Sequence, residues 1–383
     1  MALHFTREEF EARQTATRAA MAERGLDAML LFAPESHYWL TGYDTFGFCF
    51  FQCLVFTADG RMSLLTRSAD LRQARHTSII GDVRVWTDEA GASPAGQLRD
   101  LLESLRLRGK RLGIETDTQG LVHANGRAVS AALEGFAALA EASDLVPRLR
   151  VVKSAAELDY VRRAAALADA ALDAGLAVIA PGADEGDILA AMQGAVFAGG
   201  GEYPGNPFIL GSGADALLCR DKAGRRRLDA QDQVTLEFAG VFRRYHAALM
   251  RTVIVGEPRP RHRELHAAAR EALEAVEEAL RPGRTAGEVF EAHARVLDGR
   301  GLAAHRLNAC GYSLGARYAP SWMDWPMFYR DNPAVLAPDM VFFAHMILMD
   351  SDAGAAVTLG RTYRITDGAP ESLSRASLDL PVR

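Results

Sequence analysis

Short apolar runs and amphipathic stretches alternate along the first 150 residues, a pattern typical of a mixed α/β domain. Residues 7–24 are polar with regular apolar returns and precede Gly25, which indicates an amphipathic helix that ends at a glycine. The strands predicted after it are residues 28–32, 48–56, 62–66, 83–86 and 111–115, with further helices at 95–107 and 122–138. We therefore expect an N-terminal α/β domain over residues 1–150, an ordinary domain size.

From residue 151 onward the pattern changes to pairs of longer helices, each pair followed by strands. Ser154 and Glu157 have the spacing of a capping box, which predicts a helix that runs to about residue 179. The elements predicted next are a helix at 184–198, strands over 207–255, two helices within 260–300 separated at Pro282 and Gly283, and strands at 340–349 and 356–366. We expect a second domain over residues 151–383 in which this arrangement occurs twice. The last ~15 residues are polar, and we expect them to be loosely ordered.

Composition narrows the class of protein. With 49% hydrophobic and 24% charged residues among 383, the chain has the make-up of a folded globular protein, and extensive disorder is excluded. The net charge of −6 gives no reason to expect a nucleic-acid or membrane-surface partner. No apolar run reaches the ~18 residues of a membrane span, and the N-terminus lacks the apolar core of a signal peptide. We expect a cytoplasmic protein with free thiols, because the spacing of Cys49 and Cys53 fits neither a zinc site nor a redox pair.

The most informative polar residue is Glu237, a single carboxylate in an apolar strand between Leu236 and Phe238. Because side chains alternate along a strand, Glu237 faces the side of the sheet opposite to its two neighbours. One interpretation is a solvated residue on a half-exposed sheet. The other is a functional site, since the hairpin that continues from this strand also carries tyrosine, histidine and arginine side chains on rigid elements.

The hairpin over residues 232–256 resembles the one that carries the first two metal ligands in the creatinase/prolidase/methionine-aminopeptidase superfamily, which has the pita-bread fold. Residues 153–158 are similar to the start of the catalytic domain there, and residues 35–43 to a segment of the creatinase and prolidase N-terminal domain. The resemblance covers most of the chain. It implies an α/β (α+β) protein in which a creatinase-like N-terminal domain precedes a pita-bread domain, with pseudo-two-fold helix pairs on a curved antiparallel sheet. In this family the segment that matches residues 35–43 often reaches toward the partner subunit's active site, so we expect a homodimer in which residues 35–51 approach the other chain's site.

The metal-binding members of the superfamily place Asp, Asp, His, Glu and Glu at five set points. Carried over position by position, those points in this chain are Glu237, Ala248, Tyr312, His345 and Gly360. Only Glu237 and His345 could bind a divalent metal, and two ligands do not supply the several donors that such a site needs. The position of a further family histidine is occupied by Arg220. The resemblance therefore implies the scaffold without the dinuclear metal centre, and we expect no metal and no other cofactor.

Among metal-free relatives, the ectoine hydrolase subgroup is the closer match. The hairpin segment 236–247, the Gly-Gly-Glu-Tyr-Pro turn at 200–204 and the Cys-Gly-Tyr loop at 310–315 are similar to segments of that subgroup. Arg220 and residues 322–327 depart from it. The resemblance implies hydrolysis of a C–N bond in a small cyclic amidine, guanidino or amide compound, with an ectoine-like solute as the expected substrate.

Charge explains how such a reaction could proceed without a metal. A metalloenzyme stabilises the oxyanion that develops on an amide with a Lewis acid, whereas an amidinium or guanidinium carbon is already beside positive charge. A carboxylate can bind that cation and either attack it or activate water. The expected catalytic residues are Glu237, Tyr312 and His345. The expected substrate-binding residues are Arg220, Glu202, Tyr203, His246, Arg251 and Trp322.

Each assignment has a structural alternative. His345 and Tyr312 also suit a packed core, His246 a purely structural role, and Glu202 an ordinary loop. Trp322 either walls an aromatic pocket for a cation or packs in the core. The three arginines at residues 225–227 are expected to form a solvated turn. For the whole protein, the alternatives are a catalytically silent pita-bread binding module, an Xaa-Pro dipeptidase-like peptidase, or a lyase that acts on a small zwitterion.

Overall fold

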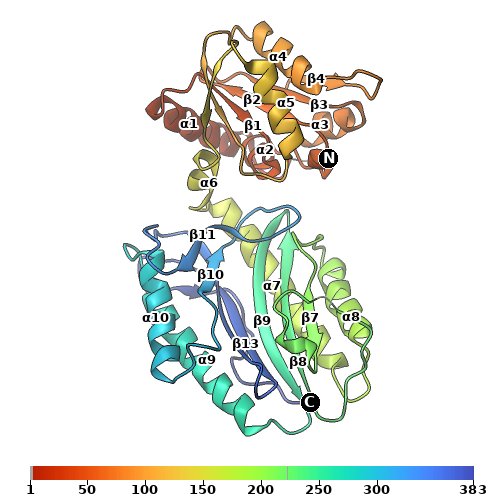
Figure 1. The fold of residues 1–383 in the computed structure, drawn as a ribbon, viewed down its shortest axis with the longest axis vertical. Helices are drawn as coiled ribbons and strands as arrows, with labels where there is room; N and C mark the ends of the chain where they lie inside the picture. Colours follow the sequence, from red (N-terminus) through yellow and green to blue (C-terminus); the bar gives the residue numbers. More distant parts are fainter. Residues whose placement is uncertain (1–2, 222) are drawn as a thin grey trace. The chain divides into compact units, whose positions relative to one another are not determined.

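The computed structural model describes residues 3–221 and 223–383, and the chain divides into two compact units, Met1–Arg150 and Val151–Arg383. The first unit contains a six-stranded mixed sheet in the order β4-β3-β2-β1-β5-β6 (Figure 1). Its strands are β1 (Ala28–Leu31), β2 (Cys53–Thr57), β3 (Met62–Arg67), β4 (Asp82–Trp86), β5 (Arg111–Ile114) and β6 (Ala138–Glu141). Its helices are α1 (Arg7–Glu23), α2 (Pro34–Thr41), α3 (Leu71–Thr77), α4 (Pro94–Ser104), α5 (His123–Leu133) and α6 (Leu145–Arg150). The expected α/β character of this part of the chain is confirmed.

The first unit departs from the sequence prediction where aromatic residues are concentrated. The strand predicted at 48–56 is wrong in its first half, because Gly47–Cys49 form a 3-10 helix and β2 begins only at Cys53. Helix α2 was missed, since all of its residues are buried and no polar face marks its period. The carboxylate of Glu115 stabilises the start of α2 by accepting hydrogen bonds from the Ala33 N–H (2.7 Å) and the Ser36 hydroxyl (2.5 Å).

Within residues 35–51, the structure separates buried aromatic side chains from exposed ones. The buried ones are His37, Tyr38, Trp39, Tyr43 and Phe51. Phe46 and Phe50, in contrast, are 80% and 43% exposed. The aromatic residues of this segment that a partner chain could contact therefore lie in its second half.

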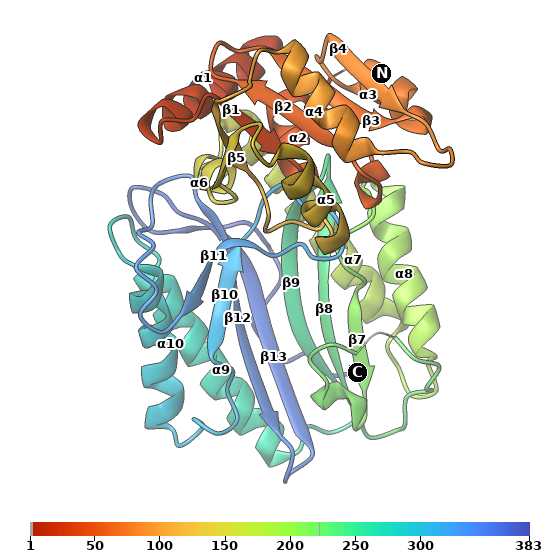
Figure 2. The same ribbon diagram turned by 45° about the horizontal axis from the view of Figure 1, so that its top comes forward.

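The second unit is built on an eight-stranded antiparallel sheet in the order β11-β10-β12-β13-β9-β8-β7, with β14 paired to β13 (Figure 2). Its strands are β7 (Ile209–Ser212), β8 (Asp232–Phe242), β9 (Tyr245–Val255), β10 (Ala309–Ser313), β11 (Asp324–Tyr329), β12 (Val341–Asp350), β13 (Ala355–Arg364) and β14 (Glu371–Ser372). Its helices are α7 (Ala155–Val178), α8 (Glu185–Ala198), α9 (Pro260–Ala279) and α10 (Ala286–Gly299). Two helices followed by antiparallel strands occur twice, as expected, and the capping box of Ser154 and Glu157 is present.

The helices cover one face of this sheet and leave Glu237 on the other. Helix α7 packs against β8 and β9, and α9 packs against β12 and β13. Gly240 shows how close the first contact is, because a Cβ atom at this position would lie 2.0 Å from the carbonyl oxygen of Ala164 in α7. Gly240 and Phe238 lie on the face of β8 that contacts the helices. Because side chains alternate along a strand, Glu237 lies on the other face and points away from the helices. No helix in the described ranges is long and apolar enough to cross a membrane.

The C-terminal residues are bonded to the second unit, so the prediction of a loosely ordered tail is wrong. The Ile254 N–H donates to the carbonyl of Pro381 (2.9 Å), and the Ile254 carbonyl accepts from the N–H of Arg383 (2.8 Å). The carboxylate of Asp169 in α7 accepts a hydrogen bond from the Ser374 hydroxyl (2.5 Å). The tail is held largely through backbone groups, which is why its polar side chains did not indicate its order.

Candidate active site

Strand register places Glu237 and His345 in one row across the sheet of the second unit. Glu237 pairs with Met250, Met250 with Gly360, and Gly360 with His345. Paired residues of neighbouring strands point to the same face of a sheet. All four positions therefore lie on the face opposite the helices.

A second row on this face contains the other two positions inferred from the family ligand set. The Ala248 N–H donates to the Thr362 hydroxyl (3.0 Å), Thr362 pairs with Phe343, and Phe343 pairs with Tyr312. The strands thus gather all five positions, which span more than a hundred residues of sequence, into two adjacent rows. Among the described side chains of these two rows, Glu237 is the one whose pKa lies near neutral pH.

Trp322, Tyr312 and Glu237 form a hydrogen-bonded chain. The indole N–H of Trp322 donates to the Tyr312 oxygen (2.8 Å), and the Tyr312 hydroxyl donates to Oε1 of Glu237 (3.2 Å). An indole nitrogen can only donate, so the Tyr312 proton is directed to the carboxylate. Trp322 and Tyr312 are buried, which holds the Glu237 carboxylate in one orientation.

The environment of Glu237 brings its ionisation into the neutral range. Burial raises the pKa of Glu237 to about 7, against the opposing effects of the Tyr312 hydrogen bond and the positive charge of Arg220. Burial, together with the charge of Glu237, raises the pKa of Tyr312 well above its usual value, so its hydroxyl stays protonated. A carboxyl group with a pKa near 7 can take up or release a proton at neutral pH, as general acid–base catalysis requires.

His345 lies beyond Tyr312 in the same site. The imidazole ring is 5.6 Å from the Tyr312 ring and 5.5 Å from the Phe343 ring, measured between centroids. Burial lowers the pKa of His345 to about 3, with a further contribution from His293, so the imidazole is neutral. Its Nδ1 atom is buried without a hydrogen-bond partner among the described residues. This nitrogen is closed off from solvent.

Arg220 is exposed, and its positive charge acts on Glu237. The segment that carries it is held at its base by the buried carboxylate of Glu185, which accepts from the Ser212 hydroxyl (2.5 Å) and the Gly224 N–H (2.9 Å). Arg226 adds an ion pair with Asp232 (2.5 Å). The expectation of a solvated turn at residues 225–227 is therefore wrong for Arg226, because its guanidinium helps to position this segment.

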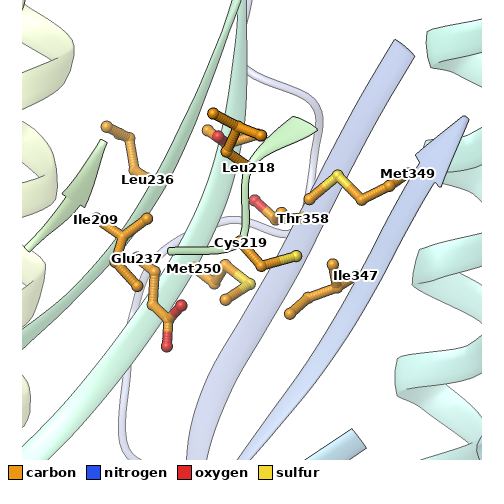
Figure 3. A pocket seen from close by; sticks show the side chains of 10 residues that line it. Ile209, Leu218, Cys219, Leu236, Glu237, Met250, Ile347, Met349 and Thr358 are labelled. Atoms are coloured by element: carbon orange, nitrogen blue, oxygen red, sulfur yellow. The ribbon is translucent and has the colours of Figure 1, made fainter. Parts of the chain in front are cut away.

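A small pocket adjoins Glu237 (Figure 3). Its lining includes Ile209, Leu218, Cys219, Met250, Ile347 and Met349. Thr235 and Thr358 also line it and stand two residues along their strands from the Glu237 row, on the side away from Tyr312. The pocket encloses about 240 Å³ of space between atoms, open solvent included. Glu237 is its one charged lining residue within the described part of the chain.

Glu202 and Tyr203 lie near the turn of the β8–β9 hairpin, and no contact between either of them and Glu237 is found in the described residues. The Glu202 carboxylate accepts a hydrogen bond from the Arg244 N–H (3.0 Å) and lies 3.8 Å from the Arg244 guanidinium. Arg244 has a positive φ of 68°, a strained conformation for a non-glycine residue, and this bond helps to hold it. Tyr203 is 76% exposed, with its ring 4.9 Å from that of Phe197.

His246 is a buried structural residue in this arrangement. Its Nε2 accepts from the Gly205 N–H (2.9 Å), which leaves Nδ1 to donate to the Gly315 carbonyl (3.4 Å). Burial lowers its pKa to about 3, so the imidazole stays neutral. Its ring lies 6.4 Å from that of Trp322. His246 thus supports the loops that carry the site, and both of its nitrogens are already bonded.

Arg251 is also placed away from Glu237. Its neighbour Met250 points into the site, so Arg251 points to the helix-covered face. Its guanidinium donates to the carbonyls of Met250 and Gly360, both at 2.7 Å, and to that of Ser377 at 3.2 Å. Burial lowers the pKa of Arg251 to about 10, which still leaves it protonated at neutral pH. Through these hydrogen bonds Arg251 links strands β9 and β13 to the C-terminal residues.

The residues present do not fit the dinuclear metal centre of the superfamily. Within the described ranges, no three His, Cys, Asp or Glu side chains are grouped so that they could hold a metal ion. The space for a carboxylate at position 360 is filled, since a Cβ atom on Gly360 would lie 2.6 Å from Phe343 and 3.0 Å from Met250. Glu237 and His345 alone supply too few donors.

Sequence reasoning missed the residues that form the pocket. Alternation from His345 along β12 puts Ile347 and Met349 on the same face, and that signal was present in the sequence. No comparable signal marked Cys219, because the segment that carries it has no regular period. The segment with Cys219 is held over the sheet by Glu185, which is distant in sequence and bonds to Ser212 at the start of the segment.

Replacing Glu237 by glutamine should make the stability of the protein less dependent on pH. In the folded chain the pKa of Glu237 is about 7, above its ordinary value of 4.5. The stability it contributes is therefore full below pH ~4.5 and is lost as the pH rises through about 7. Glu237→Gln does not ionise. By calorimetry at pH 8 its free energy of unfolding should exceed that of the wild type, by at most about 3 kcal/mol, and the gain should shrink at pH 5.

Glu278→Gln on the exposed side of α9 is the matched control and should show no such gain. A Glu237→Gln variant whose stability follows that of the wild type at both pH values would contradict a carboxyl group with a raised pKa.

Comparison with protein families shows which proteins this chain is related to. Residues 159–367, more than half of the chain, match the model of metallopeptidase family M24, and residues 13–152 match the creatinase/prolidase N-terminal domain. Ectoine hydrolase of Halomonas elongata is 28% identical over 392 residues, which cover 98% of this chain and 97% of that protein. An uncharacterized hydrolase/peptidase of Sinorhizobium fredii is 27% identical over 393 residues, which cover 100% and 99% of the two chains.

Among solved structures, an Xaa-Pro dipeptidase from Bacillus anthracis matches with a TM-score of 0.85 at 20% identity, over 98% of this chain and 100% of that one. At this identity the likeness shows the fold alone. The names of the relatives support a hydrolase, and the family matches confirm the pita-bread resemblance. The chain belongs to metallopeptidase family M24 and carries a creatinase/prolidase N-terminal domain.

Proposed function

We propose that this protein hydrolyses a C–N bond in a small cyclic amidine, guanidino or amide compound without using a metal, with an ectoine-like solute as the best candidate. The observation that carries the proposal is the partly buried Glu237 carboxylate, held by Tyr312 on a sheet face where, among the described residues, no group of side chains could hold a metal ion. The 28% identity to ectoine hydrolase along almost the whole chain supports the same choice.

The chemistry follows from charge. A cationic amidinium pairs with the Glu237 carboxylate, and its carbon is then attacked by that carboxylate or by a water molecule that the carboxylate deprotonates. When water attacks, its oxygen bonds to the carbon, Glu237 passes the proton it took from the water to the leaving nitrogen, and the C–N bond breaks. When the carboxylate attacks, its oxygen bonds to the carbon and the C–N bond breaks, and water then hydrolyses the covalent intermediate and restores the free carboxylate. Tyr312 keeps the carboxylate oriented, and the neutral His345, whose ring lies beside that of Tyr312, is the third residue that we assign to the reaction. The positive charge of Arg220, which acts on Glu237, supports a role for this residue in binding an anionic substituent on the substrate.

Three other functions compete with this one: a peptidase, a lyase and a silent binding module. An Xaa-Pro dipeptidase-like peptidase, or a lyase of similar ancestry, would need metal ligands that positions 248, 312 and 360 do not provide. A catalytically silent binding module would share the fold, as does the N-terminal domain of the FACT complex subunit SPT16 from chickpea, at 15% identity and a TM-score of 0.77. The pKa of Glu237, near 7, favours an active site over a silent pocket.

The proposal is tested by incubating the purified protein with ectoine and with a library of polar metabolites, and by following consumption with mass spectrometry. On the substrate found, Glu237→Gln should lower kcat by a factor of about 10² to 10⁴, since it keeps the shape but removes the base or nucleophile. The surface variant Glu278→Gln should retain the wild-type rate.

Metal dependence is checked in the same samples. Elemental analysis should find far less than one Mn, Fe, Co or Zn per chain, and activity should persist after treatment with EDTA. Stoichiometric metal, activity lost to EDTA and restored by Mn²⁺, or full activity in Glu237→Gln would each contradict the proposed mechanism.

We also propose a cytoplasmic homodimer in which the second half of residues 35–51 contacts the partner chain. The exposed Phe46 and Phe50 supply the apolar surface that such a contact would bury. Light scattering at micromolar concentration should give twice the chain mass of 41.5 kDa. Phe46→Ser should shift the protein toward monomer, whereas Phe197→Ser, at an exposed phenylalanine of the second unit, should not. A monomeric wild type would contradict the proposal.

A further inference from the structure

The pocket beside Glu237 is lined by apolar groups next to a single carboxylate. Met250 and Ile347 form its floor on β9 and β12, and Leu218 and Cys219 cross above them (Figure 3). Met349 lies farther along β12 and is partly exposed. The hydroxyls of Thr235 and Thr358 also line the space but are bonded to the Ala216 carbonyl and to the Thr252 hydroxyl. The rest of the lining is methyl, methylene, thioether and thiol groups, so a polar group placed there would lose bonds to water.

The pocket is also small. Its closed part has room for about one water-sized group, which is close to the size of a methyl group. A chain of three or more carbons would have to displace the segment that carries Leu218 and Cys219. That segment is anchored through Glu185 to Ser212 and Gly224, so displacement costs stability. Size alone therefore sets an upper limit on what the pocket accepts.

The position of the pocket gives a bound molecule a fixed orientation. Tyr312 and Trp322 lie on one side of Glu237, and the pocket lies on the other. A cation paired with the carboxylate therefore has Tyr312 on one side and the floor of Met250 and Ile347 on the other, so an apolar substituent fits on the pocket side. The carboxylate at one end of the site and the apolar groups at the other thus favour a ligand that carries both a positive charge and a short alkyl group.

We propose that this pocket binds an alkyl substituent of one or two carbons carried by the substrate on the amidine or guanidine carbon. The inference rests on the proposed function, because it names the class of substrate that the same site takes. Each buried methylene group should raise the affinity about fourfold until the pocket is full.

The test uses isothermal titration calorimetry on the full-length chain with tetrahydropyrimidinium ions that carry hydrogen, methyl, ethyl or propyl on the amidine carbon. The affinity should rise about fourfold from hydrogen to methyl, rise again or level off at ethyl, and fall at propyl. Neutral primary amides with the same alkyl groups are titrated in parallel.

Three variants sharpen the result. Met349→Trp fills the outer part of the pocket and should lower the affinity of the methyl- and ethyl-bearing ions more than that of the hydrogen-bearing ion. Met349→Ala enlarges the pocket and should move the optimum to propyl. Met62→Ala, at a partly buried methionine on β3 in the first unit, is the matched control and should leave the series unchanged.

The possible results distinguish failure of the pocket proposal from failure of the proposed function. If the wild type and both Met349 variants bind all the ions with the same affinity, the proposal of an alkyl-binding pocket is wrong. The proposal of a cation site at Glu237 would then still stand. A chain-length optimum in the neutral amides, with no binding of the ions, would support the pocket and contradict a cationic substrate. Absence of binding in both series overturns the inference.

Discussion

The hydrogen bond from the Trp322 indole to the Tyr312 hydroxyl controls the rest of the site. Because the indole can only donate, it occupies the acceptor side of the Tyr312 oxygen and turns the phenolic proton toward Glu237. Tyr312 then stabilises the ionised carboxylate, while burial favours the protonated form. The two effects leave the pKa of Glu237 near 7, where one proton can be gained or lost during a reaction.

The strands that carry the hydrogen-bonded chain of Trp322, Tyr312 and Glu237 are held together by Arg251, which lies on the opposite face of the sheet. The two halves of the sheet pair directly at only two positions of β9 and β13 in the described structure, Leu359 with Arg251 and Gly360 with Met250. The Arg251 guanidinium bonds to the carbonyls of Gly360 and Met250 at this junction. Since Met250 lies between Glu237 and His345 in the same row, Arg251 stabilises the spacing of the two halves of the site without facing the substrate.

The five positions inferred from the family ligand set carry little charge in this chain. Ala248, Tyr312 and Gly360 have no acidic side chain, and the ring of Phe343 packs against Tyr312 and beside Gly360. The remaining carboxylate becomes a partly buried, isolated acid beside an apolar pocket. Such a site favours a ligand that brings its own positive charge.

Sequence pattern predicted what depends on local periodicity. It gave the two helix–helix–strand segments and, through alternation along β8, the face on which Glu237 lies. It could not give the contact of Tyr312 with Glu237, because these residues are on strands separated by 75 positions and β10 carries an irregularity in its register at Tyr312. Arg251 and His246 have the residue types of a binding site, but backbone groups from distant loops occupy their polar atoms. The same long-range backbone bonding orders the C-terminal tail.

The most direct measurement is a titration of Glu237 itself, by NMR of protein labelled with ¹³C at the glutamate carboxyl carbons and assigned through Glu237→Gln. The account gives a pKa near 7 for this group in the wild type. Tyr312→Phe, which removes the donor, should raise that pKa further, and Trp322→Phe should raise it by a smaller amount because Tyr312 is then less well oriented. A pKa near the ordinary 4.5 in the wild type, or one that Tyr312→Phe leaves unchanged, would contradict the hydrogen-bonded chain on which the account rests.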